Sequence, residues 1–329
     1  MRIIHVREIA NVAATLVDGL QRLGHQAELK PMRIRPSETT MAKRIVLLPG
    51  RLRETAEINR YIHRNHFDVV HLHWAYMGWM GILGRYPYLL HCHGFDLTRN
   101  LRWPFMGWLT RQALKNAQRV FYSTPDLMAP AARVRPDSVF IPNPINLLNF
   151  RPAKASTGKG RRILMISRFE AKKGPETALA MIRELKRRDP SVQVDAFRWG
   201  VLASQLADPR LMNLIPTVPY RDMPALLSSY DIVVGQFKLG IVSMSELEAM
   251  ACGRPVVSHF NYPEVYDEPP PIFSTRDAEE GAEILARLVE DEQMRREAGE
   301  RGRAWVEGHH DYAKVAQLVE GHYREVLGG

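Results

Sequence analysis

The chain has 329 residues, of which 45% are hydrophobic, so it can bury a large core, and its length predicts two domains rather than a disordered or single small one. Its two cysteines lie far apart, which excludes a disulfide framework and favours a reducing cytosol. The net charge is +9, and residues 1–150 hold 20 Lys and Arg against 10 Asp and Glu. Such a basic half fits an anionic partner (a lipid headgroup, a phosphorylated acceptor or nucleic acid) or ordinary solubilising charge.

No segment has the pattern of a secretion signal or a membrane span. Met1 leads directly into RIIHV, without the charged and long apolar regions of a signal peptide. Arg85, His91 and His93 interrupt the most hydrophobic region before it reaches the roughly 18 apolar residues that a spanning helix needs. We therefore expect a soluble or peripheral protein.

The first half alternates short β-rich runs with helical patterns. Strands are expected at RIIHV, RIVLL, DVVHLH, YLLHCHG, RVFYS and SVFIPN, and helices at 9–23 and 53–64. Alternation of this kind predicts a parallel sheet covered by helices.

The same rhythm restarts after a Pro-, Gly- and Lys-rich linker at residues 142–162. Strands are expected at ILMIS, VQVDAF, DIVVG and PVVS, helices at 176–188, 223–229 and 245–251, and a helical tail at 277–326. We predict two doubly wound α/β domains, 1–150 and 151–310, and a final helix at 311–329. Open α/β sheets bind ligands beyond the carboxyl ends of their strands, which predicts a binding cleft between the domains.

A cationic loop precedes the first helix of the second half, in RFEAKKGPETALAM. Arg168 and Lys173 follow a strand end and come just before a helix N-terminus, which itself favours an anion. A planar guanidinium and a compact ammonium together suit a diphosphate. The alternative is a solvated basic loop.

A second loop, in GQFKLGIVSMSELEAMACGRPVVS, also ends at a helix. Ser243 and Glu246 have the spacing of a capping box, which gives Glu246 a structural explanation. Glu248 has no such explanation, and its position early in the helix suits a carboxylate that accepts hydrogen bonds from the two hydroxyls of a ribose.

Together SRFEAKKG, SELEAMACGRPVV, HCHGFD, DVVHLHW and FIPNPINLLNF resemble the retaining glycosyltransferases of the GT-B fold, family 4, nearly end to end. The resemblance implies two Rossmann-like domains facing each other across a cleft, the first for the acceptor and the second for the donor, and a C-terminal helix that packs back on the first. It also implies that Arg168 and Lys173 hold the diphosphate of a nucleotide sugar, that Glu248 binds the ribose, and that His93 lies beside the transferred sugar.

Two positions depart from that family. Gly240 replaces a glutamate that usually contacts the donor sugar, so the sugar is held differently, with Lys238 or Gln236 as candidates, or the donor is unusual, or activity is lost. The usual Gly-Gly loop near the acceptor is replaced by HVREIANVAAT.

The departing nucleoside diphosphate builds negative charge, so prearranged cations and N–H groups should supply most of the acceleration. Arg168, Lys173 and the N–H groups after Ser243 fit that role, and we expect no metal and no cofactor. Four histidines have His-x-His spacing on expected strands and could chelate an ion: His71, His73, His91 and His93. We instead interpret His71 and His91 as satisfied strand residues and expect His93 to reach the cleft. Asp96 fits either a polar group near the sugar or acceptor, or a cap of a local turn.

Four of the six tryptophans lie within residues 74–111: Trp74, Trp79, Trp103 and Trp108. With Arg99, Arg102 and Arg111 they suit an anionic membrane surface or a lipid-linked acceptor. The alternative, which we favour for Trp74 and Trp79, is that they pack in the core.

The sequence thus predicts a retaining hexosyltransferase that uses a UDP- or GDP-linked sugar and a lipid-linked or saccharide acceptor in cell-envelope synthesis. We expect it in the cytoplasm, peripheral on the inner face of the membrane. The alternatives are a sugar-nucleotide epimerase and a non-catalytic homologue that binds nucleotide sugar or membrane. Nucleic-acid binding is not expected, because the basic half has no motif for it.

Overall fold

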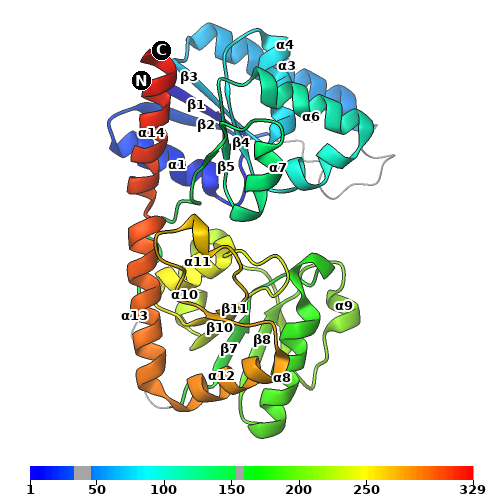
Figure 1. The fold of residues 1–329 in the computed structure, drawn as a ribbon, viewed down its shortest axis with the longest axis vertical. Coiled ribbons are helices and arrows are strands. Elements are labelled where there is room, and N and C mark those ends of the chain that lie inside the picture. The colour runs from blue at the N-terminus through cyan, green and yellow to red at the C-terminus, as the bar shows by residue number, and fades with distance from the viewer. Residues whose placement is uncertain (33–45, 153–158, 329) are drawn as a thin grey trace. The chain divides into compact units, whose positions relative to one another are not determined.

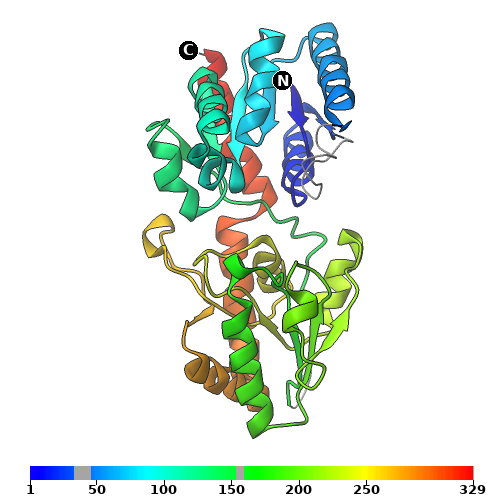
Figure 2. The same cartoon turned by 90° about the vertical axis from the view of Figure 1, so that its right-hand side faces the viewer.

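A computed structural model describes residues 1–32, 46–152 and 159–328. The chain forms two compact α/β units, one made of Met1–Pro144 together with the segment from Tyr312 onward, the other of Ile145–Asp311. Figures 1 and 2 show the helices that cover the faces of each sheet. The sequence boundary was placed at residue 150, but Ile145 and Phe150 already pack in the core of the second unit.

The first unit is built on a six-stranded parallel sheet with the order β2-β1-β3-β4-β5-β6. Its strands are β1 (Arg2–Val6), β2 (Gln26–Lys30), β3 (Val69–His73), β4 (Leu89–Cys92), β5 (Arg119–Tyr122) and β6 (Val139–Phe140). Its helices are α1 (Val12–Arg22), α3 (Leu48–Asn65), α4 (Gly78–Gly84), α5 (Phe95–Thr98), α6 (Pro104–Asn116), α7 (Met128–Ala132) and α14 (Tyr312–Gly328). Helices α3, α4 and α6 contribute Ile58, Met80 and Leu114 to the main core of this unit.

The second unit is built on a parallel sheet with the order β12-β11-β10-β7-β8-β9. Its strands are β7 (Arg162–Met165), β8 (Gln193–Phe197), β9 (Asn213–Ile215), β10 (Ile232–Val234), β11 (Val256–Ser258) and β12 (Phe273–Ser274). Its helices are α8 (Pro175–Arg188), α9 (Ala203–Leu206), α10 (Met223–Ser228), α11 (Met244–Ala251), α12 (Ala278–Glu290) and α13 (Glu292–His309). Two clusters of buried side chains, one with α8 and α12 and the other with α11 and α13, form its core.

Most of the predicted elements are confirmed, and the differences have local causes. The predicted strand RIVLL is wrong where the structure describes it, because Leu48 begins α3; Arg44 and Ile45 lie outside the described residues. A short apolar run fits a strand and a buried helix equally well. Strands β2, β9 and β12 were not predicted, because each is only partly buried and lacks a continuous apolar run.

Helix α14 belongs to the first unit and packs on α1. The close approach depends on Gly19: a Cβ there would lie 2.6 Å from the Cβ of Ala316 and 2.9 Å from the carbonyl oxygen of Tyr312. No helix among the described residues is both long enough and apolar enough to cross a bilayer.

Gly19→Ala should therefore destabilise the protein by about 1–3 kcal/mol, because the added methyl group overlaps the backbone of α14. Gly321→Ala on α14 is the matched control, since a Cβ there meets nothing within 4 Å. Denaturant unfolding of the two variants tests the contact. Equal stability of both would contradict it.

Candidate active site

The strand orders mark one point in each sheet where ligands are expected. A doubly wound sheet binds ligands where the strand order reverses, because the loops that follow the two neighbouring strands diverge there. In the second unit this point lies between β7 and β10, and in the first between β1 and β3. The two donor motifs of the sequence, at Arg168–Gly174 and Gly235–Ser243, follow β7 and β10.

The loop after β7 places Arg168 against an aromatic ring. Its guanidinium carbon lies 5.2 Å from the ring centroid of Trp199, which follows β8, and its Nη1 lies 3.5 Å from Glu170. The Arg168 side chain is 53% exposed, so much of the guanidinium is open to a ligand. Sequence reasoning missed Trp199, because nothing in its local pattern connects it with an arginine about thirty residues earlier.

The loop after β10 is built around the buried carboxylate of Glu246. One oxygen accepts a hydrogen bond from the Gln236 N–H at 2.7 Å and the other from the Ser243 N–H at 2.5 Å. A Cβ at Gly235 would collide with this carboxylate, which explains the glycine. The capping box predicted for Ser243 and Glu246 is confirmed.

A backbone hydrogen bond joins the two loops. The N–H of Phe237 donates to the carbonyl oxygen of Lys173 at 2.9 Å. Burial lowers the pKa of Lys173, and the nearby Glu246 carboxylate opposes that shift. Burial likewise raises the pKa of Glu246, against the hydrogen bonds from Ser243 and Gln236. The structure thus brings Arg168, Lys173 and the N-terminus of α11 to one edge of the sheet.

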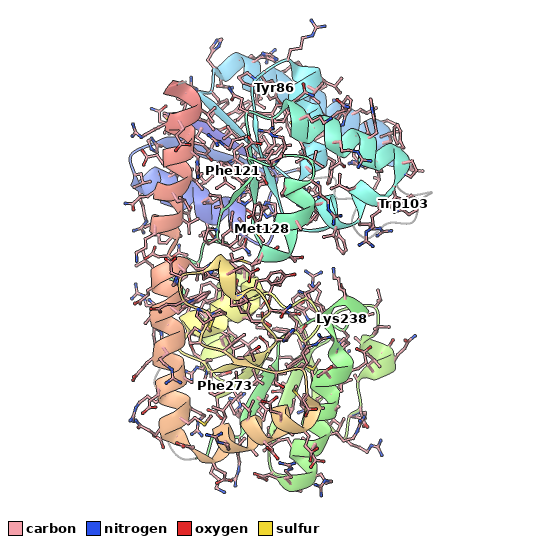
Figure 3. The ribbon with its side chains drawn as sticks, in the orientation of Figure 1. Tyr86, Trp103, Phe121, Met128, Lys238 and Phe273 are labelled. Atoms are coloured by element: carbon pink, nitrogen blue, oxygen red, sulfur yellow. The ribbon has the colours of Figure 1, made fainter. Side chains whose placement is uncertain are left out.

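The position of Gly240 explains why this chain has no glutamate there. Its φ is +70°, in the left-handed region that favours glycine, and a Cβ would lie 3.0 Å from that of Asn261. Gln236 is 1% exposed, and its side chain bonds to the backbone of Ile241 and Leu239, so its amide braces the loop. Of the two candidate sugar contacts, Lys238 is the exposed one (Figure 3).

Glu248 lies in the middle of α11 and is 5% exposed. Burial raises its pKa to about 8, and the hydroxyl of Tyr220 opposes that shift. The carboxyl is therefore largely protonated at neutral pH, and it can both donate and accept a hydrogen bond.

In the first unit, His93 follows β4 and is half-buried. Its Nε2 lies 2.9 Å from Nδ1 of His73, and burial, reinforced by the positive charge of Arg7, lowers its pKa to about 3. Asp96 is fully buried and accepts hydrogen bonds from the N–H groups of Ala75 at 2.9 Å and Gly94 at 2.8 Å. Its carboxylate thus fixes the turn that carries His93.

Unusual backbone angles gather at the same edge of this sheet. Arg7, Ala10 and Asn11 after β1 have φ values of 76°, 48° and 62°, and Trp74 after β3 has φ 80° and ψ 129°. Residues other than glycine adopt such conformations at a cost of the order of 1–3 kcal/mol, and they concentrate at functional sites. The loop after β1 stands where the resemblance implies a Gly-Gly loop, and its left-handed backbone could not be predicted from the residue types.

The aromatic side chains divide into two groups. Trp74 and Trp79 pack against the main core of the first unit, as predicted, and Nε1 of Trp79 donates to the carbonyl oxygen of Leu109 at 2.9 Å. Trp103 and Trp108, in contrast, are 58% and 51% exposed. We call the exposed surface of α5, α6 and their connection the aromatic–basic surface; it comprises Phe95, Arg99, Arg102, Trp103, Phe105, Trp108 and Arg111.

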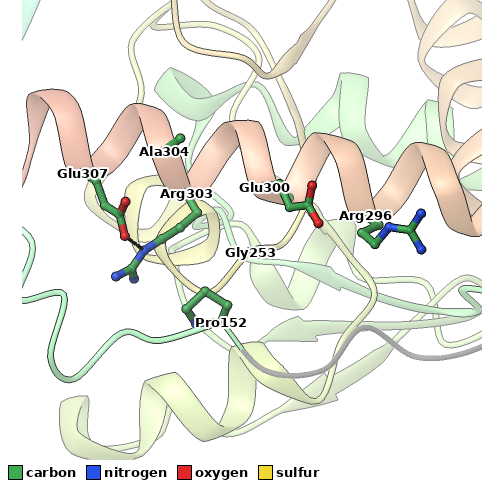
Figure 4. A pocket seen from close by; sticks show the side chains of 8 residues that line it. Pro152, Gly253, Arg296, Glu300, Arg303, Ala304 and Glu307 are labelled. Atoms are coloured by element: carbon green, nitrogen blue, oxygen red, sulfur yellow. Dashed lines mark hydrogen bonds and ion pairs between the residues drawn. The ribbon is translucent and has the colours of Figure 1, made fainter.

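A hollow in the second unit lies along α13 and holds none of the predicted donor residues (Figure 4). Pro152, Gly253 and the side chains of α13 line it. One of these, Arg303, pairs with Glu307 and donates to the carbonyl oxygen of Ala251. These contacts give the hollow's polar groups a structural role in attaching α13.

The raised pKa of Glu248 predicts how stability depends on pH. Between pH 4.5 and about 8 the unfolded chain loses this proton and the folded chain keeps it, so the group's contribution to stability falls as pH rises. Glu248→Gln keeps a neutral side chain at every pH. The variant should gain thermal stability relative to the wild type from pH 5 to pH 8, and parallel melting temperatures over that range would contradict the shift.

Comparisons with known proteins agree with this architecture. Two family models match: a glycosyl transferase 4-like domain at residues 8–144 and a glycosyl transferase-like domain at residues 179–321. A search of curated proteins gives no match.

Solved structures share the fold at low identity. A sucrose-phosphate synthase from Thermosynechococcus elongatus is 17% identical, with 100% of both chains covered and a TM-score of 0.75. HepE from Anabaena, solved with UDP and glucose, is 14% identical over 98% of this chain and 99% of that one, with a TM-score of 0.71. A protein described as a putative UDP-N-acetylglucosamine 2-epimerase from Listeria monocytogenes is 15% identical over 98% and 96%, with a TM-score of 0.63. With both units matched by glycosyltransferase models and the whole chain by this fold, the protein belongs to the GT-B glycosyltransferases of the family 4 type.

Proposed function

We propose that the protein transfers a sugar, with retention of configuration, from a UDP- or GDP-linked donor to a hydroxyl group. The observation that carries the proposal is the joined pair of loops at the reversal point of the second sheet, where Arg168, Lys173 and the N-terminus of α11 converge. HepE, of the same fold, was solved with UDP and glucose, which supports a nucleotide sugar as donor. Retention rests on the family resemblance.

In this proposal the second unit, Ile145–Asp311, binds the donor. Arg168 and Lys173 bind the diphosphate, and the free N–H groups after Ser243 add partial positive charge. The negative charge that builds on the leaving phosphate therefore meets cations already in place. The stacking of Arg168 on Trp199 limits the guanidinium's freedom before the donor arrives.

Glu248 is the proposed ribose contact, and its protonated carboxyl can donate to one ribose hydroxyl and accept from the other. Lys238 is the proposed donor-sugar contact in place of the missing glutamate, with the backbone at Gly240 leaving the loop without a side chain. No metal ion or cofactor takes part in this step, since the cations of the loops neutralise the leaving group.

The first unit, Met1–Pro144 with α14, is proposed to bind the acceptor. His93 stands at the carboxyl end of its sheet, and its low pKa keeps the ring neutral at physiological pH. A neutral imidazole can orient a hydroxyl group of the sugar, whereas an imidazolium would oppose the oxocarbenium-like transition state. Asp96 contributes by holding the His93 turn.

The proposed acceptor is a saccharide or a lipid-linked saccharide of the cell envelope, reached from the cytoplasmic face of the membrane. Large aromatic side chains beside three exposed arginines on the aromatic–basic surface support a peripheral contact with anionic lipid. Nucleic acid is not a proposed partner.

Two other functions fit specific observations. The similarity to the putative epimerase from Listeria favours sugar-nucleotide epimerisation as the second candidate. A non-catalytic homologue that binds nucleotide sugar or membrane is the third, because Gly240 stands in place of the usual sugar-binding glutamate.

One experiment separates these functions. The protein is incubated with a panel of UDP- and GDP-sugars, with and without membrane extract, while free nucleoside diphosphate and sugar identity are followed. Diphosphate release that depends on the extract supports transfer, and the anomeric configuration of the product, read by NMR, tests retention. A changed sugar without extract supports epimerisation, and binding without either supports the non-catalytic function.

Arg168→Ala and Lys173→Ala should each lower turnover by about a hundredfold or more, because the loss of one prearranged charge raises the barrier by about 3 kcal/mol. Arg187→Ala, an exposed cation paired with Glu184 at the far end of α8, is the matched control and should keep full turnover. Circular dichroism confirms the fold of each variant. Wild-type rates in both loop variants would refute the diphosphate assignment.

Replacing Arg99, Arg102 and Trp103 together by Ala should weaken binding to phosphatidylglycerol-containing liposomes by about thirtyfold or more, since each basic residue at an anionic surface contributes about 1 kcal/mol. Leu52 and Arg53, exposed on α3, form the control pair for Ala substitution. Co-sedimentation measures both. If the wild type does not sediment with anionic liposomes, or if the two variants behave alike, the surface has another role.

A further inference from the structure

Five histidines of the first unit form one buried cluster. The strand register places His5 beside His71 across β1 and β3, and His73 beside His91 across β3 and β4. His93 follows two residues after His91. The first four are 0% exposed, and only His93 is half-buried. Two sets of three within this cluster have ligand atoms that all lie within 4.8 Å of one another: His5, His71 and His73; and His73, His91 and His93.

Hydrogen bonds account for most of the ring nitrogens, but not for Nε2 of His71 or for either nitrogen of His91. Nε2 of His73 lies 3.0 Å from Nδ1 of His5, whose Nε2 lies 3.1 Å from the Tyr323 hydroxyl. That hydroxyl lies 2.5 Å from Nδ1 of His71. Within the described part of the chain, neither ring nitrogen of His91 has a hydrogen-bond partner.

The unpaired ring of His91 points to a missing ligand. A neutral imidazole always carries a proton on one nitrogen, so His91 keeps a buried N–H without an acceptor in either tautomer. Such a group costs about 1–3 kcal/mol. A metal ion bound by one nitrogen gives that nitrogen a partner, so that only the N–H on the other nitrogen stays unpaired.

We infer that His73, His91 and His93 form a binding site for a divalent transition-metal ion of the Zn²⁺ class. Three imidazoles and no carboxylate suit Zn²⁺, Co²⁺, Ni²⁺ or Cu²⁺ rather than Mg²⁺ or Ca²⁺. The ion is separate from the leaving-group chemistry of the second unit, and its binding does not depend on the proposed function.

The geometry is close to what such an ion requires. Zn–N bonds of about 2.0–2.1 Å at tetrahedral angles place ligand nitrogens about 3.3 Å apart. Nδ1 of His73 and Nε2 of His93 are now 2.9 Å apart, so this pair opens by a few tenths of an ångström. Since no two ligand nitrogens of the set are more than 4.8 Å apart, the other pairs of nitrogens need to approach each other by at most about 1.5 Å.

The outer set is favoured over the deeper one because it keeps the existing hydrogen bonds. An ion at His5, His71 and His73 would compete with the bonds of His5, because both of its ring nitrogens are already bonded, to His73 and to Tyr323. An ion at the outer set replaces only the His73–His93 bond and leaves His73 bonded to His5. Ligand histidines usually bond through their second nitrogen in this way.

An ion can reach the site from solvent, and the imidazole rings of the site are neutral. His93 is half-buried and stands at the carboxyl end of β4, so an ion can enter from that edge. Burial lowers the pKa of His73 and His91 well below the usual value, which keeps these rings in the neutral form that binds metals.

The test is metal titration of the chelator-treated full chain. Isothermal titration with Zn²⁺ should show one high-affinity ion per chain, Co²⁺ should give a visible absorption band of a tetrahedral site, and Cu²⁺ should show nitrogen hyperfine coupling in EPR. His91→Phe should weaken Zn²⁺ binding by more than about a hundredfold, since losing an outer-shell partner alone costs about 10–100-fold.

His71→Phe is the matched control, because it removes a histidine of the same cluster that is not a proposed ligand; it should keep the ion. Because His91→Phe alters the core, His93→Ala at the edge of the sheet is a second ligand variant, and melting curves without metal establish that each variant is folded. Wild-type affinity in folded His91→Phe and His93→Ala, loss of the ion in His71→Phe alone, or no saturable Zn²⁺ binding would each overturn the site.

Discussion

The buried carboxylate of Glu246 constrains the loop after β10 in the second unit, where the donor is proposed to bind. Its two oxygens accept the N–H groups of Gln236 and Ser243, so one side chain fixes both ends of the loop after β10. A buried carboxylate without such partners would be costly, and a side chain at Gly235 would exclude it. The same carboxylate faces Lys173, whose carbonyl oxygen receives the N–H of Phe237. The positions of the two loops therefore follow from satisfying one acidic group.

In the first unit the buried polar groups are imidazoles rather than a carboxylate, and they lie on a face of the sheet that water does not reach. Burial keeps the rings neutral, and a chain of hydrogen bonds through His73, His5 and Tyr323 satisfies most of them. This series of hydrogen bonds ends at Tyr323 on α14, so the orientation of His93 depends on a residue some 230 positions later in the sequence. The unusual backbone of Arg7 and Trp74 lies at the same edge. Polar interior and strained backbone together indicate a surface shaped for binding rather than for stability.

The sequence alone was sufficient for the fold class and for the helix start after the β10 loop, because both depend on local patterns. Apolar periodicity gave the alternating strands and helices, and Ser243 and Glu246 revealed a helix start. What it missed depends on three dimensions. The half-exposed edge strands lack a clear apolar period. The stacking of Arg168 on Trp199 joins two loops that are separate in the sequence. Glycine is favoured at position 240 because the backbone φ there is +70°. The histidines were read in pairs along single strands, and only the register across three strands gathers five of them.

Helix α14 completes the first unit, yet it is synthesised after the whole of the second unit. Tyr323 supplies the hydroxyl between His5 and His71, and Ala316 fits against Gly19, so neither contact can form until the second unit has been synthesised. During translation the second unit can acquire its full core while the first still exposes the α1 surface that α14 covers. The unit whose synthesis begins first is thus completed only after the other unit. A fragment of residues 1–144 would lack helix α14, which covers α1.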